Sequence, residues 1–226
     1  MNVFRVIRPP DIFTLLNLVF GFMAILFAGR AGGSSTQYAL VFILLAAMAD
    51  GLDGLVARKM GGSPLGANLD SLADLVSFGL APPFLAISAF HLPPHIWPAA
   101  ILFLLCGALR LARFNIVSAK SDQNFEGLPI PAAGLALSAS VLLGWPQLTI
   151  LLMLFLALLM TSSIPYPKIR DLRLMTLFSS VYILVAAVLL WRHDTDYILY
   201  AALLLAGLIL LYMISPVVIK RLRKGR

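Results

Sequence analysis

Residues 50–74 read DGLDGLVARKMGGSPLGANLDSLAD, and this stretch sets how the helices on either side of it must pair. The sequence GGSP at 61–64 ends one helix before the next begins. Because so short a turn makes the two helices antiparallel neighbours, and spacings of three and four keep each acidic pair on one face, their carboxylates are expected to converge. These residues, four of the ten acidic residues in the chain, are Asp50, Asp53, Asp70 and Asp74.

The composition around this stretch predicts an all-α, polytopic membrane protein. Of the 226 residues, 61% are apolar and 12% are charged, too few polar residues to cover a soluble domain. Apolar runs of about 18 residues or more predict spanning helices, because the backbone amides must be satisfied within the segment. About eight spans are expected, at 12–29, 38–58, 69–90, 96–118, 131–145, 147–164, 174–191 and 196–216. The alternative is six, with 131–164 as one pair packed differently or partly re-entrant.

Basic residues divide unevenly between the two sides of this topology. With eight spans and both termini in the cytoplasm, fifteen of the seventeen Lys and Arg residues lie on the cytoplasmic side, leaving only Arg30 and Arg192 outside. This asymmetry predicts a multi-pass protein of the cell membrane whose acidic stretch faces the cytoplasm. It also accounts for the net charge of +7 through anionic membrane lipids, without a nucleic-acid partner.

Three regions are expected along the chain. Residues 1–10 carry Arg5 and Arg8 among apolar residues and predict an amphipathic segment at the cytoplasmic interface. Residues 11–164 form the helix bundle around the acidic stretch, and Asp11 can cap its first helix. Residues 165–226 add further C-terminal transmembrane helices and a basic cytoplasmic tail.

The expected carboxylate cluster needs a positive partner. Like charges this close repel strongly where water is scarce, and a divalent cation relieves the repulsion. The alternative is that the Asp side chains merely pair with Arg and Lys. Neither Cys106, inside an apolar span, nor the histidines, at the predicted outer side, lie nearby. Oxygen ligands alone favour Mg²⁺ or Mn²⁺ over zinc or copper.

Small residues leave one face of the second predicted helix nearly bare. Gly51, Gly54 and Ala57 recur every three residues. Such a stripe is typical of close helix packing in membranes, but beside an acidic metal cluster it also lets a flat or bulky ligand approach the backbone. Arg58 then becomes a candidate phosphate clamp.

These residues together resemble the signature of the CDP-alcohol phosphotransferase family, D-x2-D-G-x2-A-R, then, after seven or eight residues, G-x3-D-x3-D. Members are membrane enzymes that move a phosphate-bearing group from a cytidine-diphosphate donor to an alcohol and release CMP. The resemblance covers roughly residues 10–135. The signature is met by Asp50, Asp53, Gly54, Ala57, Arg58, Gly66, Asp70 and Asp74.

The resemblance implies roles for particular residues. Metal ligation is expected from Asp50, Asp53 and Asp70, with Asp74 contributing to the cluster and acting as the general base. Thr14 and Asn17, three residues apart, would by themselves be typical interhelical hydrogen-bond groups. Contacts to the donor, CDP-diacylglycerol, are expected from Thr14, Asn17, Asp50, Gly54, Ala57, Arg58 and Gly66.

Three segments, LDSLADLVSFGLAP at 69–82, RLARFN at 110–115 and FEGLPIPAAG at 125–134, resemble integral-membrane phosphatidylserine synthases. The implied acceptor is L-serine. Arg110 and Arg113 would ordinarily be explained as charges that set topology, but the resemblance favours a place in the acceptor site. The residues expected to hold serine or a phosphate are Arg110, Arg113, Asn115 and Glu126.

Other readings remain open from the sequence. Within the family, the acceptor could instead be glycerol 3-phosphate, inositol phosphate or another alcohol. A cation transporter could also place four Asp residues in a membrane, although its charges are normally found at mid-bilayer on broken helices. Relatives often form homodimers, and a homodimer is expected here as well.

Overall fold

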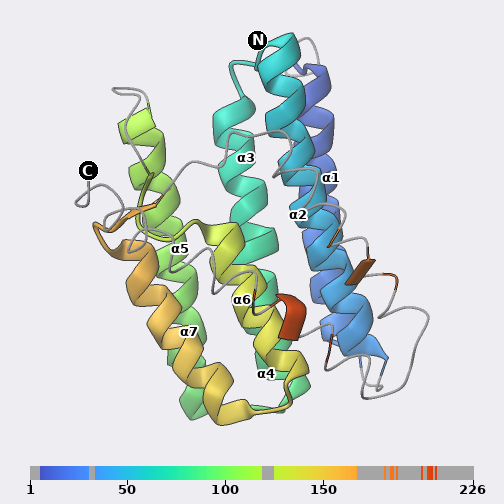
Figure 1. Ribbon diagram of the computed structural model, residues 1–226, viewed down its shortest axis with the longest axis vertical. Helices are drawn as coiled ribbons and strands as arrows, with labels where there is room; N and C mark the ends of the chain where they lie inside the picture. Colours follow the sequence, from blue (N-terminus) through green and yellow to red (C-terminus); the bar gives the residue numbers. More distant parts are fainter. Residues whose placement is uncertain are drawn as a thin grey trace, which may run out of the picture.

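The computed structural model describes residues 6–30, 34–118 and 125–166, and single positions at 181, 184, 185, 187, 200, 203–205 and 207. Over the three long ranges the chain is a bundle of antiparallel helices with one two-stranded ladder (Figure 1). The helices are α1 (Pro9–Ala28), α2 (Ser35–Met60), α3 (Gly66–Asp74), η2 (Leu75–Leu80), α4 (Ala81–Ala89), η3 (Pro94–Ile96), α5 (Trp97–Ser118), α6 (Ile130–Leu142) and α7 (Pro146–Thr161). The strands β1 (Phe125–Glu126) and β2 (Pro165–Tyr166) pair antiparallel.

Within the part of the chain that the structure describes, four helical units are long and apolar enough to cross a membrane. They are Pro9–Ala28, Ser35–Met60, Gly66–Ala89 and Pro94–Ile116, which confirms the first four expected spans within about three residues at most boundaries. The helices α6 and α7 have 13 and 16 residues. At 1.5 Å per residue they reach only about 20 and 24 Å, short of the roughly 30 Å hydrocarbon core.

The structure therefore tests only part of the predictions of eight spans and of three regions. The segments at 174–191 and 196–216 lie almost wholly outside the described residues. For the expected interfacial segment 1–10, residues 6–8 are not helical and α1 already begins at Pro9, while residues 1–5 lie outside the description. Those parts stay predictions.

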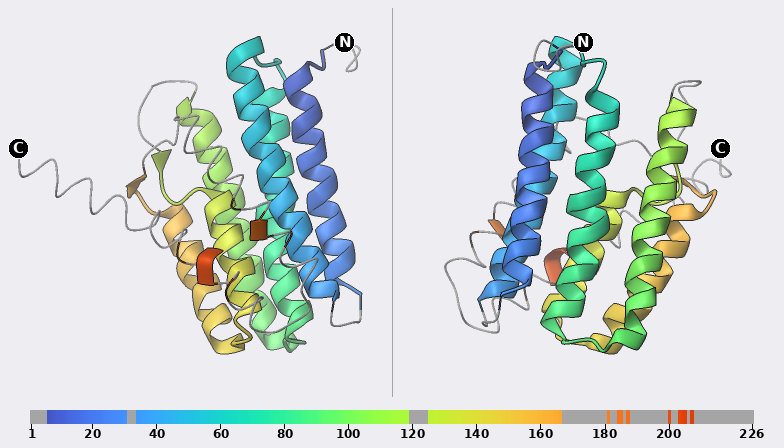
Figure 2. Two further views of the ribbon diagram at one scale, coloured as in Figure 1. Left: turned by 45° about the vertical axis from the view of Figure 1, so that its right-hand side comes forward. Right: turned by 180° about the vertical axis from the view of Figure 1, so that it is seen from behind.

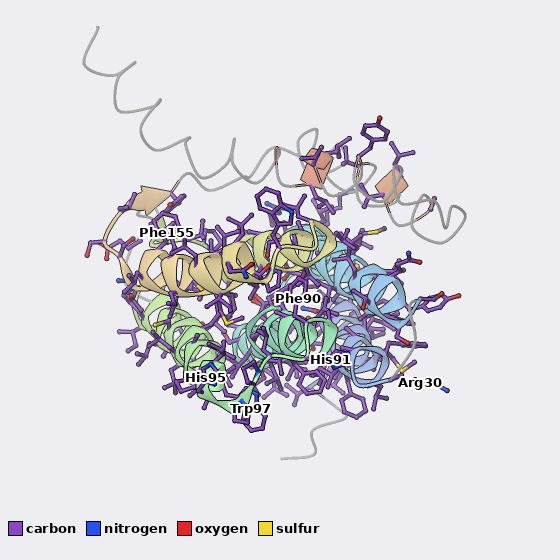
Figure 3. All side chains as sticks on the ribbon, turned by 90° about the horizontal axis from the view of Figure 1, so that it is seen from below. Arg30, Phe90, His91, His95, Trp97 and Phe155 are labelled. Carbon is purple, nitrogen blue, oxygen red and sulfur yellow. The ribbon has the colours of Figure 1, made fainter. Side chains whose placement is uncertain are left out.

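The helices place the acidic stretch and the histidine-bearing connection at opposite ends of the bundle. The α2–α3 connection lies beside the start of α1, whereas the end of α1, the start of α2 and the α4–α5 connection lie at the other end (Figures 1 and 2). Seen from that other end, Arg30, His91, His95 and Trp97 lie at the near ends of the helices (Figure 3). His91 and His95 are thus far along the bundle from the α2–α3 turn, as the sequence predicts.

Local sequence explains where the helices begin and end. Pro9 and Pro10 occupy the first turn of α1, where their missing N–H groups cost nothing. The Asp11 carboxylate accepts the Arg8 backbone N–H at 2.8 Å, which caps the helix as expected. The helix α2 ends at Gly61, whose φ of +82° suits glycine and few other residues.

A π-helical turn, η2, interrupts the third span directly after Asp74. The N–H of Ala81 bonds to the carbonyl of Val76, five residues back, and Pro82 and Pro83 cannot donate to the preceding turn. Helices press on this turn from two sides. A Cβ added to Gly21 of α1 would lie 2.7 Å from the Cα of Ser77, and one added to Gly134 of α6 would lie 2.8 Å from the Phe78 carbonyl.

This packing predicts that Gly21→Ala destabilises the bundle by about 1–3 kcal/mol through overpacking against the backbone of Ser77. The measurement is the thermal unfolding midpoint of the detergent-solubilised protein. Gly51→Ala is the matched control, since nothing lies within 4 Å of its added Cβ and alanine favours a helix. Equal midpoints for the two variants would contradict the close approach of α1 to η2.

Candidate active site

Three carboxyl groups from two antiparallel helices meet at the end of the bundle near the α2–α3 turn. Asp50 of α2 and Asp70 and Asp74 of α3 each offer an oxygen atom, and these atoms all lie within 4.8 Å of one another. Two trans ligands of Mg²⁺ are separated by about 4.2 Å, twice its metal–oxygen distance, so small rotations of the side chains would close the cluster around such an ion. The donor set fits a hard divalent cation.

Asp53, the fourth predicted ligand, is held by α1 and does not belong to this group of three. The hydroxyl of Thr14 donates to Asp53 Oδ2 at 2.7 Å, and both side chains are buried. The Thr14 hydroxyl also approaches the Pro10 carbonyl, at 3.4 Å. Thr14 therefore makes the interhelical hydrogen bond that its position on α1 suggests.

Asn17 lies one turn further along α1 and contacts Asp74. Its Nδ2 donates to Asp74 Oδ1 at 3.1 Å, and its own backbone carbonyl accepts the Ser77 hydroxyl at 2.9 Å. The side chain is fully buried, and its Oδ1 has no hydrogen-bond partner. Like Thr14, Asn17 thus connects α1 to an acidic residue of another helix.

The small-residue stripe of α2 faces open space at two of its positions. A Cβ added to Gly51 or Gly54 would meet no atom within 4 Å. Ala57 is partly buried, and Arg58 is exposed near the end of α2. The room over Gly54 is what a ligand lying on the helix backbone would need, so this face remains the candidate donor surface.

The α2–α3 turn is fastened to the start of α1 by two hydrogen bonds. The Ser63 hydroxyl donates to Asp11 Oδ1 at 2.8 Å, and an Arg8 Nη1 donates to the Gly62 carbonyl at 2.8 Å. Gly66 sits against this pair, with an added Cβ 3.5 Å from Asp11 Oδ1. Sequence reasoning foresaw Asp11 only as a helix cap, and its spacing from Ser63 gives no signal of the contact.

Arg110 is the cation that faces the acidic cluster from α5. It is 6% exposed, and its charge interacts favourably with Asp70 and Asp74. The guanidinium also lies over the ring of Phe114, 5.6 Å from the ring centroid. Of the two arginines in the RLARFN segment, Arg110 is placed beside the candidate metal ligands.

Arg113, one turn later, is engaged by backbone carbonyls. Its guanidinium nitrogens donate to the carbonyls of Glu126 at 2.7 Å, Ser162 at 3.0 Å, and Met160 and Thr161 at 3.3 Å. It thereby caps the end of α7 and ties β1 to it. Gly127 closes the same junction, with a φ of +78° and room for no side chain, since a Cβ would lie 2.3 Å from the Met160 carbonyl.

The remaining predicted acceptor residues are Asn115 and Glu126. Asn115 Nδ2 donates to the Ser71 hydroxyl at 3.0 Å, which links α5 to α3 one residue after Asp70. The side chain of Glu126 is exposed, while its backbone pairs with Pro165 of β2. The hydrogen bond of Ser71 could not be predicted from the sequence, because a serine in a transmembrane helix does not indicate which residue it will contact.

Comparison with known proteins identifies the family and several relatives of this chain. The family model for CDP-alcohol phosphatidyltransferases matches residues 8–166. The chain is 40% identical over 174 residues to the CDP-diacylglycerol–serine O-phosphatidyltransferase of Methanocaldococcus jannaschii, which covers 74% of this chain and 77% of the relative. It is 39% identical over 172 residues to the archaetidylserine synthase of Methanothermobacter thermautotrophicus, covering 72% and 71%. A Bacillus subtilis CDP-diacylglycerol–serine O-phosphatidyltransferase is 38% identical over 167 residues, covering 71% and 90%.

The carbonyl contacts of Arg113 predict that Arg113→Lys lowers the free energy of unfolding by about 1.5–3 kcal/mol, the worth of one hydrogen bond to a charged group. A lysine ammonium cannot reproduce the planar fork that reaches four carbonyls. The thermal midpoint of the purified protein measures the effect. Arg30→Lys, at an exposed position near the opposite end of the bundle, serves as the control. Equal stability of Arg113→Lys and the unsubstituted protein would rule out this capping role.

Proposed function

Because the chain belongs to the CDP-alcohol phosphatidyltransferase family, we propose that it is a metal-dependent enzyme of phospholipid biosynthesis. It transfers the phosphatidyl group of CDP-diacylglycerol to the hydroxyl of L-serine and yields phosphatidylserine and CMP. Serine as the acceptor is supported by relatives, 33–40% identical to this chain, that are named as serine O-phosphatidyltransferases or as an archaetidylserine synthase.

The observation that carries the proposal is the cluster of Asp50, Asp70 and Asp74 beside the open face of α2 at Gly54. Phosphoryl transfer depends mainly on positioning and on neutralising charge: the open face of α2 can position the donor, and a divalent cation held by the carboxylates would neutralise its charge. We assign Asp50, Asp53, Asp70 and Asp74 to the metal site. When bound there, Mg²⁺ or Mn²⁺ supplies positive charge to the diphosphate of the donor and to the departing CMP.

The chain's own residues complete the reaction. Asp74 takes the proton of the serine hydroxyl as its oxygen attacks the phosphorus that carries the diacylglycerol, and the bond from that phosphorus to the CMP oxygen breaks. Gly54 and Ala57 form the floor beneath the nucleotide, Gly66 at the start of α3 lies beside the donor, and Arg58 holds a phosphate. No protein nucleophile is needed for direct attack.

On the acceptor side, Arg110 is favoured over Arg113 as the partner of the serine carboxylate. Arg110 lies near Asp70 and Asp74, whereas the guanidinium of Arg113 is shared among four carbonyls. Asn115 and Glu126 stay candidates for the acceptor's polar groups, Asn115 because it bonds to Ser71, the residue that follows Asp70 in α3.

The enzyme is proposed to lie in the cell membrane as a homodimer with the α2–α3 end facing the cytoplasm. Arg8, Arg58 and Lys59 gather at or near that end, and cytoplasmic ends of membrane helices collect such residues. A donor whose acyl tails stay in the bilayer then presents its diphosphate to the site at the headgroup level. Both termini are proposed to be cytoplasmic.

Purified protein should release CMP and form phosphatidylserine only when CDP-diacylglycerol, serine and Mg²⁺ or Mn²⁺ are all present. Chelation with EDTA should abolish turnover, and either ion should restore it, because the clustered carboxylates need a divalent cation to offset their mutual repulsion. Glycerol 3-phosphate and inositol phosphate are the control acceptors. CMP release with one of them and none with serine would assign a different acceptor, and no CMP with any alcohol would favour a cation transporter.

Arg110→Ala should raise the KM for serine by about tenfold or more, equivalent to about 1.4 kcal/mol, since a carboxylate would lose its charged partner. The control is Lys59→Ala, which removes a positive charge exposed at the end of α2 without touching the proposed site. Initial rates at varied serine and saturating donor give the comparison. An unchanged KM and kcat in Arg110→Ala would remove this residue from the acceptor site.

A further inference from the structure

We propose that Asn17 is a positioning residue that orients the carboxylate of Asp74, and that it does not contact the donor. This inference rests on the proposed function, in which Asp74 takes the proton of the acceptor hydroxyl. It assigns a role to α1, a helix that contributes no residue to the three-carboxyl cluster.

The burial of Asn17 favours a role in orienting Asp74 over a direct contact with the donor. Its side chain is 0% exposed, so no surface is left for a nucleotide or a phosphate to touch. Asp74 retains 5% exposure. A residue that has no accessible surface can act on a substrate only through a neighbour, and the neighbour bonded to Asn17 Nδ2 is Asp74.

The two polar atoms of the Asn17 amide differ in their contacts, and only the nitrogen has a hydrogen-bond partner. Asn17 Oδ1 is buried and has no hydrogen-bond partner, a situation that normally costs about 1–3 kcal/mol. A leucine or valine at this position would avoid that cost. What the amide provides in exchange is the N–H group that meets Asp74 Oδ1 at 3.1 Å.

The backbone of Asn17 is itself held in place from the same neighbouring helix. The Ser77 hydroxyl donates to the Asn17 carbonyl, and Gly21, one turn later on α1, lets Ser77 approach closely. The side chain of Asn17 therefore reaches Asp74 from a fixed point. With one carboxylate oxygen taken by Asn17, the other oxygen is the one left for the cluster and for the acceptor's proton.

The test compares Asn17→Ala, which removes the amide, with Asn17→Asp, which keeps its size and loses its donor. Both should lower kcat by about 10- to 100-fold, the usual effect of removing such an outer contact, with the affinity for CDP, measured by calorimetry at saturating Mn²⁺, unchanged. Mn²⁺ binding, followed by electron paramagnetic resonance, should weaken in both. Ser138→Ala, which deletes another buried group without a partner but on α6, should change none of these values.

A reciprocal exchange tests the contact apart from activity. The double variant Asn17→Asp with Asp74→Asn restores a donor–acceptor pair in the opposite direction, so it should regain thermal stability that Asn17→Asp loses, while staying inactive. No such recovery would overturn the proposal, as would weaker CDP binding with an unchanged kcat. If the wild-type protein binds Mn²⁺ but makes no phosphatidylserine, the proposed function fails while the Mn²⁺ and exchange results still decide the role of Asn17.

Discussion

Three carboxyl groups whose oxygens lie within 4.8 Å of one another cannot all keep their charge at the end of an apolar bundle without compensation. The surrounding residues supply part of it. Arg110 brings a positive charge from α5, and Asn17 and Thr14 bring hydrogen-bond donors from α1 to Asp74 and Asp53. Under the proposed function, a divalent cation held by these carboxylates would complete the balance. These protein partners come from different helices because α1 packs against both α2 and α3, while α5 packs against α3.

Much of the site follows from the sequence because its main contacts are local. The GGSP turn makes α2 and α3 neighbours, and helical spacing places Asp70 and Asp74 on one face opposite Asp50. The position of Asp53 outside the group of three does not follow, because it depends on how α1 is rotated to present Thr14. Side-chain spacing within one helix carries no information about the rotation of another.

The two arginines of the RLARFN segment show a second limit. Both residues are arginines of the same short motif. Arg110 nevertheless faces carboxylates, whereas Arg113 faces backbone carbonyls at the end of α7. Backbone carbonyls are the same at every residue, so no sequence pattern marks Met160 or Ser162 as partners of Arg113. The expected segments 131–145 and 147–164, by contrast, match α6 (Ile130–Leu142) and α7 (Pro146–Thr161) within about three residues at each boundary, because proline precedes or begins each helix and polar or glycine residues follow it.

The π-helical turn η2 also changes how the third span should be read. It contains one residue more than an α-helical turn, and one residue corresponds to about 100° of rotation about the helix axis. The faces of α3 and α4 are therefore out of phase, although a single axis runs through both. A helical wheel drawn over residues 66–89 would assign α4 residues to the wrong side. The span therefore behaves as two helices of different phase. The helix α3 carries the acidic residues of the candidate site, and α4 carries buried residues of the core.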